Sequence, residues 1–183
     1  MMKRLKRHIV LIGMMGAGKT AIGTELARRL RVPFTDSDAE IEAAAAMTIS
    51  EIFARDGEAF FRDREAQVLG RLLAGPPGII STGGGAWMQE RNRRAIEASG
   101  MSVWLNCAPE TLWNRVRQRP TRPLLQTADP KGTLLRLLAE RSPVYSLADL
   151  EFLSQAGDSV EISAGRLIAA LKAAAPDLIK ELP

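Results

Sequence analysis

The chain has 183 residues, of which 46% are hydrophobic and 25% are charged, and its formal net charge is +4. This length predicts a single domain over residues 1–183 with a core of its own, and the composition excludes a disordered, fibrous or membrane-spanning chain. The single cysteine excludes an internal disulfide, and the positive charge is mostly arginine scattered along the chain. We therefore expect a cytoplasmic monomer whose arginines bind small anions, with no nucleic acid and no membrane as a partner.

Apolar runs and helical patterns alternate along the chain. In chain order they predict a strand at 8–12, a helix at 19–30, a strand at 34–35, helices at 41–46 and 58–73, a strand at 79–81, a helix at 92–98, a strand at 101–105, helices at 109–117 and 132–141, a strand at 150–153 and a helix at 163–175. The capping box Thr48-Ile49-Ser50-Glu51 opens one further helix. We expect Pro143 to stop the helix at 132–141 and Ser163 to cap the last one.

Strands that alternate with helices indicate a parallel sheet of about five strands covered by helices on both faces, an α/β doubly wound domain. Residues 117–131 are polar and contain prolines, which is typical of a mobile loop, and we expect a lid there. We expect residues 1–6 and 177–183 to be loose termini.

The strongest motif is Gly13-Met14-Met15-Gly16-Ala17-Gly18-Lys19-Thr20, which lies between the first predicted strand and the first predicted helix. That order of strand, G-x-x-x-x-G-K-T and helix is the context of a phosphate-binding P-loop, and it disfavours a plain glycine-rich turn. The glycines let backbone N–H groups point inward at the positive end of a helix, where they bind anions. We expect Lys19 to reach the β- and γ-phosphates of a nucleotide and the Thr20 hydroxyl to ligate Mg²⁺.

Two carboxylates, Asp36 and Asp38, follow the second predicted strand. In an extended turn they can point toward a common site, one to a metal and one to a substrate hydroxyl. They suit a helix N-cap and a first-turn acid equally well. The residues alone leave both interpretations open.

Two further patterns differ in how much they indicate. Arg62 and Glu65 are i, i+3 neighbours on a helix, and alone they favour a solvated ion pair worth only ~0.3 kcal/mol. Gly83-Gly84-Gly85 is more informative, because three consecutive glycines are conformationally costly and indicate positive φ or close approach of the backbone to a ligand. The P-loop, Asp36–Asp38 and these glycines all follow strands of a parallel sheet, so they should share one crevice.

The ordered set of motifs resembles the shikimate kinase family over nearly the whole chain. The matching segments are Gly13–Thr20 with Ile22-Gly23, Asp36-Ser37-Asp38, Glu51-Ile52-Phe53, Gly57-Glu58, Phe61-Arg62, Glu65, Thr82-Gly83-Gly84-Gly85, Arg122-Pro123-Leu124-Leu125 and Arg141-Ser142-Pro143-Val144-Tyr145. The resemblance implies a P-loop NTPase-type fold and a kinase that uses ATP and Mg²⁺ to convert shikimate into shikimate 3-phosphate and ADP, a step of chorismate and aromatic amino-acid biosynthesis.

The resemblance also implies roles for individual residues. Lys19 binds phosphate, Asp38 is the candidate base, and Arg122 is the lid arginine that folds onto the transferring phosphate. The ATP-binding positions are Gly16, Ala17, Gly18, Lys19, Thr20, Ala21, Arg115, which stacks on adenine, and Arg122. The shikimate-binding positions are Asp38, Arg62, Gly84, Arg141 and Glu65, which orients Arg62. The Mg²⁺ positions are Thr20 and, through water, Asp36.

Three other functions compete with this interpretation. A gluconate kinase-like enzyme is disfavoured by Arg62, the glycines at 83–85 and Arg141, because these match a site for a carboxylate and ring hydroxyls. A non-catalytic relative, such as a regulator or chaperone, would be expected to lose phosphate-binding or acceptor-binding residues, and this chain keeps both sets. A nucleic-acid-binding P-loop protein is disfavoured because no helicase-like second domain is present.

Overall fold

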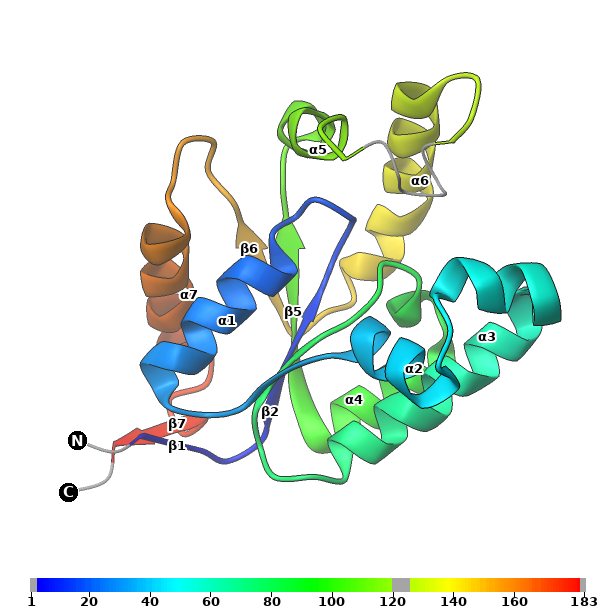
Figure 1. Ribbon diagram of the computed structural model, residues 1–183. Helices are drawn as coiled ribbons and strands as arrows, with labels where there is room; N and C mark the ends of the chain where they lie inside the picture. Colours follow the sequence, from blue (N-terminus) through cyan, green and yellow to red (C-terminus); the bar gives the residue numbers. More distant parts are fainter. Residues whose placement is uncertain (1–2, 120–125, 182–183) are drawn as a thin grey trace.

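The central sheet of the computed structural model, which describes residues 3–119 and 126–181, is parallel throughout. Its strands are β2 (His8–Ile12), β3 (Phe34–Asp36), β4 (Ile79–Ser81), β5 (Gly100–Asn106) and β6 (Leu150–Leu153). Their spatial order is β3-β4-β2-β5-β6, with β2 at the centre (Figure 1). The next two strands along the chain, β3 and β4, lie on one side of β2, and the following two, β5 and β6, lie on the other side. Ligands bind beyond the carboxyl ends of strands at such a switch point.

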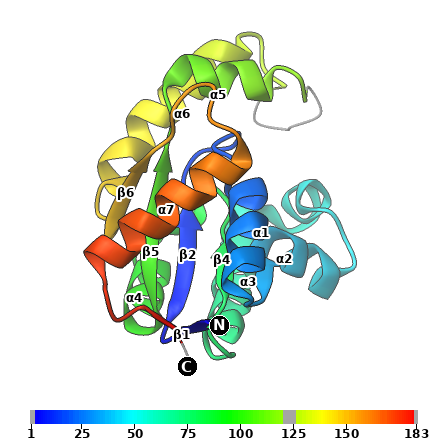
Figure 2. The ribbon, with the colours of Figure 1, turned by 90° about the vertical axis from the view of Figure 1, so that its left-hand side faces the viewer.

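Helices cover both faces of this sheet, so the predicted doubly wound α/β fold is confirmed. Helices α1 (Lys19–Leu30) and α7 (Val160–Ala174) pack together on one face, and α4 (Glu90–Ser99) with the end of α3 (Ile49–Leu73) lies on the other (Figure 2). All five residues of β2 are buried, as expected of a strand with helices on both sides. The bounds of α1 are those that the sequence predicts.

The segment between β3 and β4 is helical and stands beside the sheet. Helix α2 (Ser37–Ala45) begins directly after β3, four residues earlier than predicted. The capping box of Thr48 and Glu51 is present at the start of α3. Within α3, Gly57 has φ 83° and ψ 173°, which separates the two helices expected from the sequence. A small apolar cluster of Ile41, Ile52, Phe61 and Val68 holds this unit together.

The predicted stop at Pro143 and the predicted cap at Ser163 are also wrong. Helix α6 (Pro130–Tyr145) continues through Pro143, which removes one backbone hydrogen bond without ending the helix. Its last turn is held instead by Trp87 of the short helix η1 (Ala86–Met88), whose Nε1 donates to the Val144 carbonyl oxygen at 2.8 Å. Helix α7 is capped by Ser159 and not by Ser163, which is only 6% exposed and faces the core.

The prediction that both termini are loose is wrong for their described parts. Strand β1 (Lys3–Leu5) pairs antiparallel with β7 (Ile179–Glu181) in a separate two-stranded sheet. Leu5 and Ile179 are 4% and 5% exposed and belong to the main core, so apolar burial holds these strands in place.

The expected lid at 117–131 lies between α5 (Pro109–Val116) and α6. Arg122 and its neighbours at 120–125 fall outside the described residues. In the described part of the chain, no helix combines the length and the apolar character needed to cross a membrane.

Candidate active site

The P-loop connects the carboxyl end of β2 to α1. Gly16 and Gly18 have φ values of 80° and 89°, a left-handed conformation that side chains rarely adopt. Gly18 is also the N-cap of α1, and no side chain caps this helix. Its first turn therefore presents backbone N–H groups at the positive end of the helix dipole, as anion binding requires.

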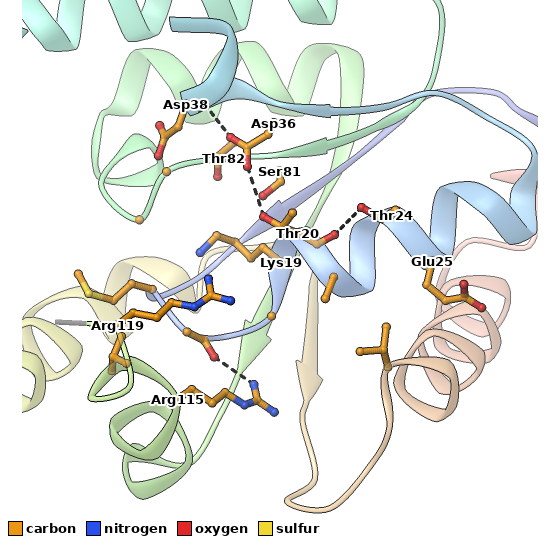
Figure 3. A pocket seen from close by; sticks show the side chains of 18 of the residues that line it. Lys19, Thr20, Thr24, Glu25, Asp36, Asp38, Ser81, Thr82, Arg115 and Arg119 are labelled. Carbon is orange, nitrogen blue, oxygen red and sulfur yellow. Dashed lines mark hydrogen bonds between the residues drawn. The ribbon is translucent and has the colours of Figure 1, made fainter. Parts of the chain in front are cut away.

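The Lys19 side chain extends over this loop. Its Nζ donates to the carbonyl oxygens of Gly13 and Met14 at 2.7 and 2.9 Å. Figure 3 shows the amine at the centre of the pocket, between the P-loop and the side chains of Asp36 and Asp38. Lys19 therefore supplies a positive charge where a phosphate group would lie against the loop.

The Asp36 carboxylate joins the P-loop to the start of α2. Its Oδ2 accepts a hydrogen bond from the Thr20 hydroxyl at 3.3 Å, and its Oδ1 accepts from the backbone N–H groups of Asp38 and Ala39 at 2.9 and 3.2 Å. Asp36 is thus the N-cap of α2 and also faces Thr20 across the crevice. The sequence left open whether Asp36 caps a helix or points toward the shared crevice, and this residue does both.

Asp38 is a largely buried carboxylate on the first turn of α2. Burial, followed by repulsion from Asp36 and Glu65, raises the pKa of Asp38 to about 6, although the charge of Lys19 opposes the rise. Its Oδ1 is buried and has no hydrogen-bond partner among the described residues. A Cβ atom at Gly83 would lie 2.6 Å from that oxygen, so only glycine permits this approach. Asp38 is a first-turn acid of α2, and its side chain also points into the pocket (Figure 3).

The pair of Arg62 and Glu65 is buried, so the solvated ion pair favoured by the sequence is wrong. Arg62 Nη1 donates to Glu65 Oε1 at 2.8 Å, and the two side chains are 17% and 1% exposed. Burial raises the pKa of Glu65, and the Arg62 guanidinium acts in the opposite direction. A second carboxylate, Glu58, lies 3.5 Å from Arg62 Nε but is 68% exposed.

The glycines at 83–85 lie against two guanidinium groups. A Cβ atom at Gly85 would overlap the Arg62 guanidinium, and one at Gly84 would lie 2.9 Å from Arg141 Nη1. None of the three has positive φ, and the close neighbours of their backbone are arginine and aspartate side chains. Close approach to a ligand stays a prediction. Arg62 comes from α3 and Arg141 from α6, so the loop brings together charges that are far apart in the sequence.

One cavity of about 880 Å³ connects the P-loop, the two aspartates Asp36 and Asp38, and the glycine loop. It is lined by parts of the P-loop, α1, the ends of β3 and β4, α5 with the residues after it, and the start of α7. Of the predicted site residues, it contacts Gly16, Gly18, Lys19, Thr20, Ala21, Asp36, Asp38, Gly84 and Arg115.

Other predicted residues lie around this cavity. Ala17 is 1% exposed beneath the loop. Arg62, Glu65 and Arg141 lie behind the glycines rather than in the cavity wall. Arg122 falls outside the described residues.

The sequence reasoning missed Arg119. It lines the cavity, and Figure 3 shows its guanidinium over the P-loop next to Lys19. Arg115, four residues earlier, donates from Nη1 to the Gly16 carbonyl oxygen at 3.0 Å. Arg119 lies beyond the end of α5, so no helical spacing from Arg115 could have identified it. Val160 and Glu161, at the start of α7, line the far end of the cavity and carried no recognisable signal.

A P-loop at the end of the central strand, with a largely buried carboxylate in the same cavity and two guanidiniums against the neighbouring glycine loop, defines a small-molecule kinase of the P-loop class. A model of the shikimate kinase family matches residues 15–172. The shikimate kinase of Ruegeria pomeroyi is 59% identical over 167 residues, covering 91% of this chain and 86% of its own. That of Cereibacter sphaeroides is 58% identical over 179 residues, covering 98% and 89%. This chain belongs to the shikimate kinase family.

The likeness extends to solved structures. Shikimate kinase from Acinetobacter baumannii, in complex with shikimate, aligns with a TM-score of 0.86 at 36% identity, covering 91% of this chain and 93% of the other.

Proposed function

We propose that this chain transfers the γ-phosphoryl group of ATP to the 3-hydroxyl of shikimate, giving shikimate 3-phosphate and ADP, a step of chorismate and aromatic amino-acid biosynthesis. This is the reaction of the family to which the chain belongs. The observation that carries the assignment of roles is the convergence of Asp38, Arg62 and Arg141 on the glycines at 83–85. An acceptor with one carboxylate and several hydroxyls matches that set of charges.

On the nucleotide side, we propose that the P-loop backbone and Lys19 hold the phosphates. Arg115, which donates to the Gly16 carbonyl oxygen, would stack on the base. Thr20 would ligate Mg²⁺ and Asp36 would hold one of its waters. The Thr20 hydroxyl oxygen and Asp36 Oδ2 lie 3.3 Å apart at the P-loop, and oxygen ligands suit Mg²⁺. When bound, Mg²⁺ neutralises charge that develops on the phosphates.

On the acceptor side, we propose that Arg62 and Arg141 grip the carboxylate of shikimate. Charge-assisted hydrogen bonds of this kind contribute ~1.5–3 kcal/mol each and fix the ring orientation. Glu65 orients Arg62, and the Gly84 backbone donates to a ring hydroxyl. Asp38 accepts the proton of the reacting hydroxyl, and its raised pKa of about 6 leaves it ionised at neutral pH.

We propose that Arg122 folds onto the transferring phosphoryl group when the nucleotide is bound. Arg119 already lies beside Lys19, so this side of the cavity presents positive charge even before such closure. Positioning and charge neutralisation supply most of the catalysis in phosphoryl transfer. Because Arg122 would bind the transition state more strongly than ATP, Arg122→Ala should lower kcat more than ATP affinity.

The deciding experiment measures ADP release from Mg-ATP with shikimate, with gluconate and with no acceptor. Rapid turnover with shikimate alone supports the proposal. Turnover with gluconate instead would keep the kinase class and remove the acceptor roles of Arg62 and Arg141. ATP binding without turnover in any of the three would indicate a non-catalytic relative.

We also expect the enzyme to act as a cytoplasmic monomer. Size-exclusion chromatography with light scattering tests the oligomeric state: a mass near 19.9 kDa supports it, and twice that mass contradicts it.

A further inference from the structure

Tyr145, the single tyrosine of the chain, is fully buried at the end of α6. Its hydroxyl donates a 2.6 Å hydrogen bond to the carbonyl oxygen of Gly84 and lies 3.8 Å from the sulfur of Met14 in the P-loop. Its ring stacks against Trp104 of β5 with centroids 5.8 Å apart. One side chain thus touches the glycine loop, the P-loop and the central sheet.

The same hydroxyl interacts with Arg141, one helical turn earlier on α6. Burial raises the pKa of Tyr145, while the charge of the Arg141 guanidinium and its hydrogen bond to the phenol oxygen act in the opposite direction. The Tyr145 hydroxyl and the Arg141 guanidinium approach the same glycine, since a Cβ atom at Gly84 would lie 2.9 Å from Arg141 Nη1 and 3.6 Å from the Tyr145 hydroxyl oxygen. Arg141 and Tyr145 therefore converge on Gly84, where the phenol bonds the carbonyl oxygen and the guanidinium lies against the backbone.

A second hydrogen bond runs between the same two segments. Trp87, three residues after Gly84, donates from Nε1 to the Val144 carbonyl oxygen at 2.8 Å, and its side chain is 0% exposed. The last turn of α6 is consequently fixed to the glycine loop by two adjacent residues. The two attached residues come directly after Pro143, where α6 lacks one backbone hydrogen bond because proline has no N–H group.

These contacts matter because the two guanidiniums come from different helices. Arg62 stands on α3 and reaches Gly85, whereas Arg141 stands on α6 and reaches Gly84. Two groups that bind one carboxylate in a fixed orientation must be held to within about 0.5 Å by side chains that are themselves locked. Tyr145 contacts both the arginine and the loop, so it sets one relative to the other.

We propose that Tyr145 is a positioning residue for the acceptor site, which acts by holding the Arg141 guanidinium in register with the Gly83–Gly85 loop. The identity of the ligand as a carboxylate-bearing acceptor rests on the proposed function. Tyr145 itself contacts no substrate in this scheme. Its hydroxyl, rather than its ring, carries the role.

The test compares Tyr145→Phe, which keeps the ring and removes the hydroxyl, with Ser102→Ala. Ser102 is a matched control, because its buried hydroxyl bonds Asp149 beside β6 at 2.9 Å instead of the acceptor site. Loss of a bond that leaves a buried acceptor unpaired should raise the shikimate KM and Kd of Tyr145→Phe roughly tenfold. The Tyr145 hydroxyl meets the P-loop only weakly, through the Met14 sulfur at 3.8 Å, and Met14 is not among the proposed ATP-binding positions. The KM for Mg-ATP should therefore stay within about twofold in both variants.

Two outcomes would overturn the proposal. One is an unchanged shikimate KM in Tyr145→Phe, and the other is an equal rise in both KM values, which indicates general loss of structure. Neither is confused with failure of the proposed function, because that would show as absent shikimate-dependent turnover in the unmutated enzyme.

A double-mutant cycle with Arg141→Ala separates direct from indirect effects. If Tyr145 acts through Arg141, the two losses of shikimate affinity are less than additive, because the second substitution removes a contact already disrupted. Full additivity contradicts the proposal.

A measurement on the unmutated protein covers the case in which Tyr145→Phe does not fold. Labelling tyrosine with ¹³C gives one Cζ signal, because the chain has one tyrosine. Titration with shikimate should shift this signal, because the shikimate carboxylate binds Arg141 beside the Tyr145 hydroxyl. Methyl shikimate, which lacks the negative charge, should shift the signal far less. Equal shifts with both, or none with either, overturn the coupling.

Discussion

The Arg62 guanidinium is paired with a Glu65 carboxylate that is only 1% exposed. A buried carboxylate of this kind restricts the arginine to one orientation, and in this protein that orientation brings the guanidinium to Gly85. The helix spacing alone suggested a weak surface pair. The structure shows instead that the pair is buried against the glycine loop, which belongs to the acceptor site that we propose.

Glu65→Gln should raise the shikimate KM roughly three- to tenfold, because an amide keeps the shape and loses the charge that holds Arg62. The control is Glu58→Gln, on the same arginine but 68% exposed and 3.5 Å away, which should change the KM less than about twofold. Steady-state kinetics at saturating Mg-ATP measures both. Equal effects of the two substitutions would remove Glu65 from the orienting role.

Arg62→Ala should weaken shikimate binding by roughly 10- to 100-fold, the value of one charge-assisted hydrogen bond, and leave ATP binding nearly intact. Calorimetric titration with each ligand measures this directly. Arg64→Ala is the matched control, because Arg64 lies on the same helix, bonds Gln67 at 2.8 Å and is exposed. An unchanged shikimate affinity in Arg62→Ala would place the carboxylate elsewhere.

Asp38→Asn should lower kcat by at least roughly 100-fold while stabilising the free protein at pH 7.5. The folded pKa of about 6 exceeds the usual value of 3.8, so the folded state holds this proton more tightly than the unfolded state. Stability from Asp38 is thus present below about pH 4 and lost as the pH rises to 6, a cost of about 1–3 kcal/mol that asparagine avoids.

The melting temperature of Asp38→Asn, measured without ligands, should exceed that of the unmutated protein by a few degrees at pH 7.5. The difference should disappear near pH 4, where both side chains are neutral. A variant that melts at the same temperature or lower at pH 7.5 contradicts the electrostatic argument, whatever its activity.

Thr20→Ala should increase the Mg²⁺ concentration for half-maximal activity by at least roughly tenfold, because it removes a hydroxyl from the ion's ligands. Thr20→Ser retains that hydroxyl and serves as the control. Activity at fixed ATP, titrated with MgCl₂, gives the comparison. Identical magnesium curves for the two variants would exclude the hydroxyl from the metal site.

Local patterns predicted the sheet and the P-loop well. The strand at 8–12 and the helix at 19–30 match β2 and α1, since apolar runs and glycine spacing act within a few residues of themselves. The capping box at Thr48 and the helix break at Gly57 also depend on residues close to them in the sequence.

Long-range contacts explain what the sequence did not show. Helix α6 passes through Pro143 because residues from elsewhere hold its final turn, and Leu5 and Ile179 find buried partners across the whole length of the chain. At the site, the i, i+3 spacing identified Arg62 and Glu65 as a pair but did not show that the pair is buried. Tyr145 stood inside a recognised motif, but its hydrogen bond to Gly84 is a contact across 61 positions.

The pairing of β1 with β7 brings the first and last strands of the described chain side by side. Lys3 lies opposite Glu181, and β1 and β7 lie near the end of the molecule where β2 begins, whereas the P-loop follows the other end of β2 (Figure 1). A short linker between these two residues would therefore join them without crossing the cavity. New ends opened in the exposed turn at 74–76 would leave a circularly permuted kinase with its site intact, and tags or surfaces attached near β1 or β7 would leave the substrates free access.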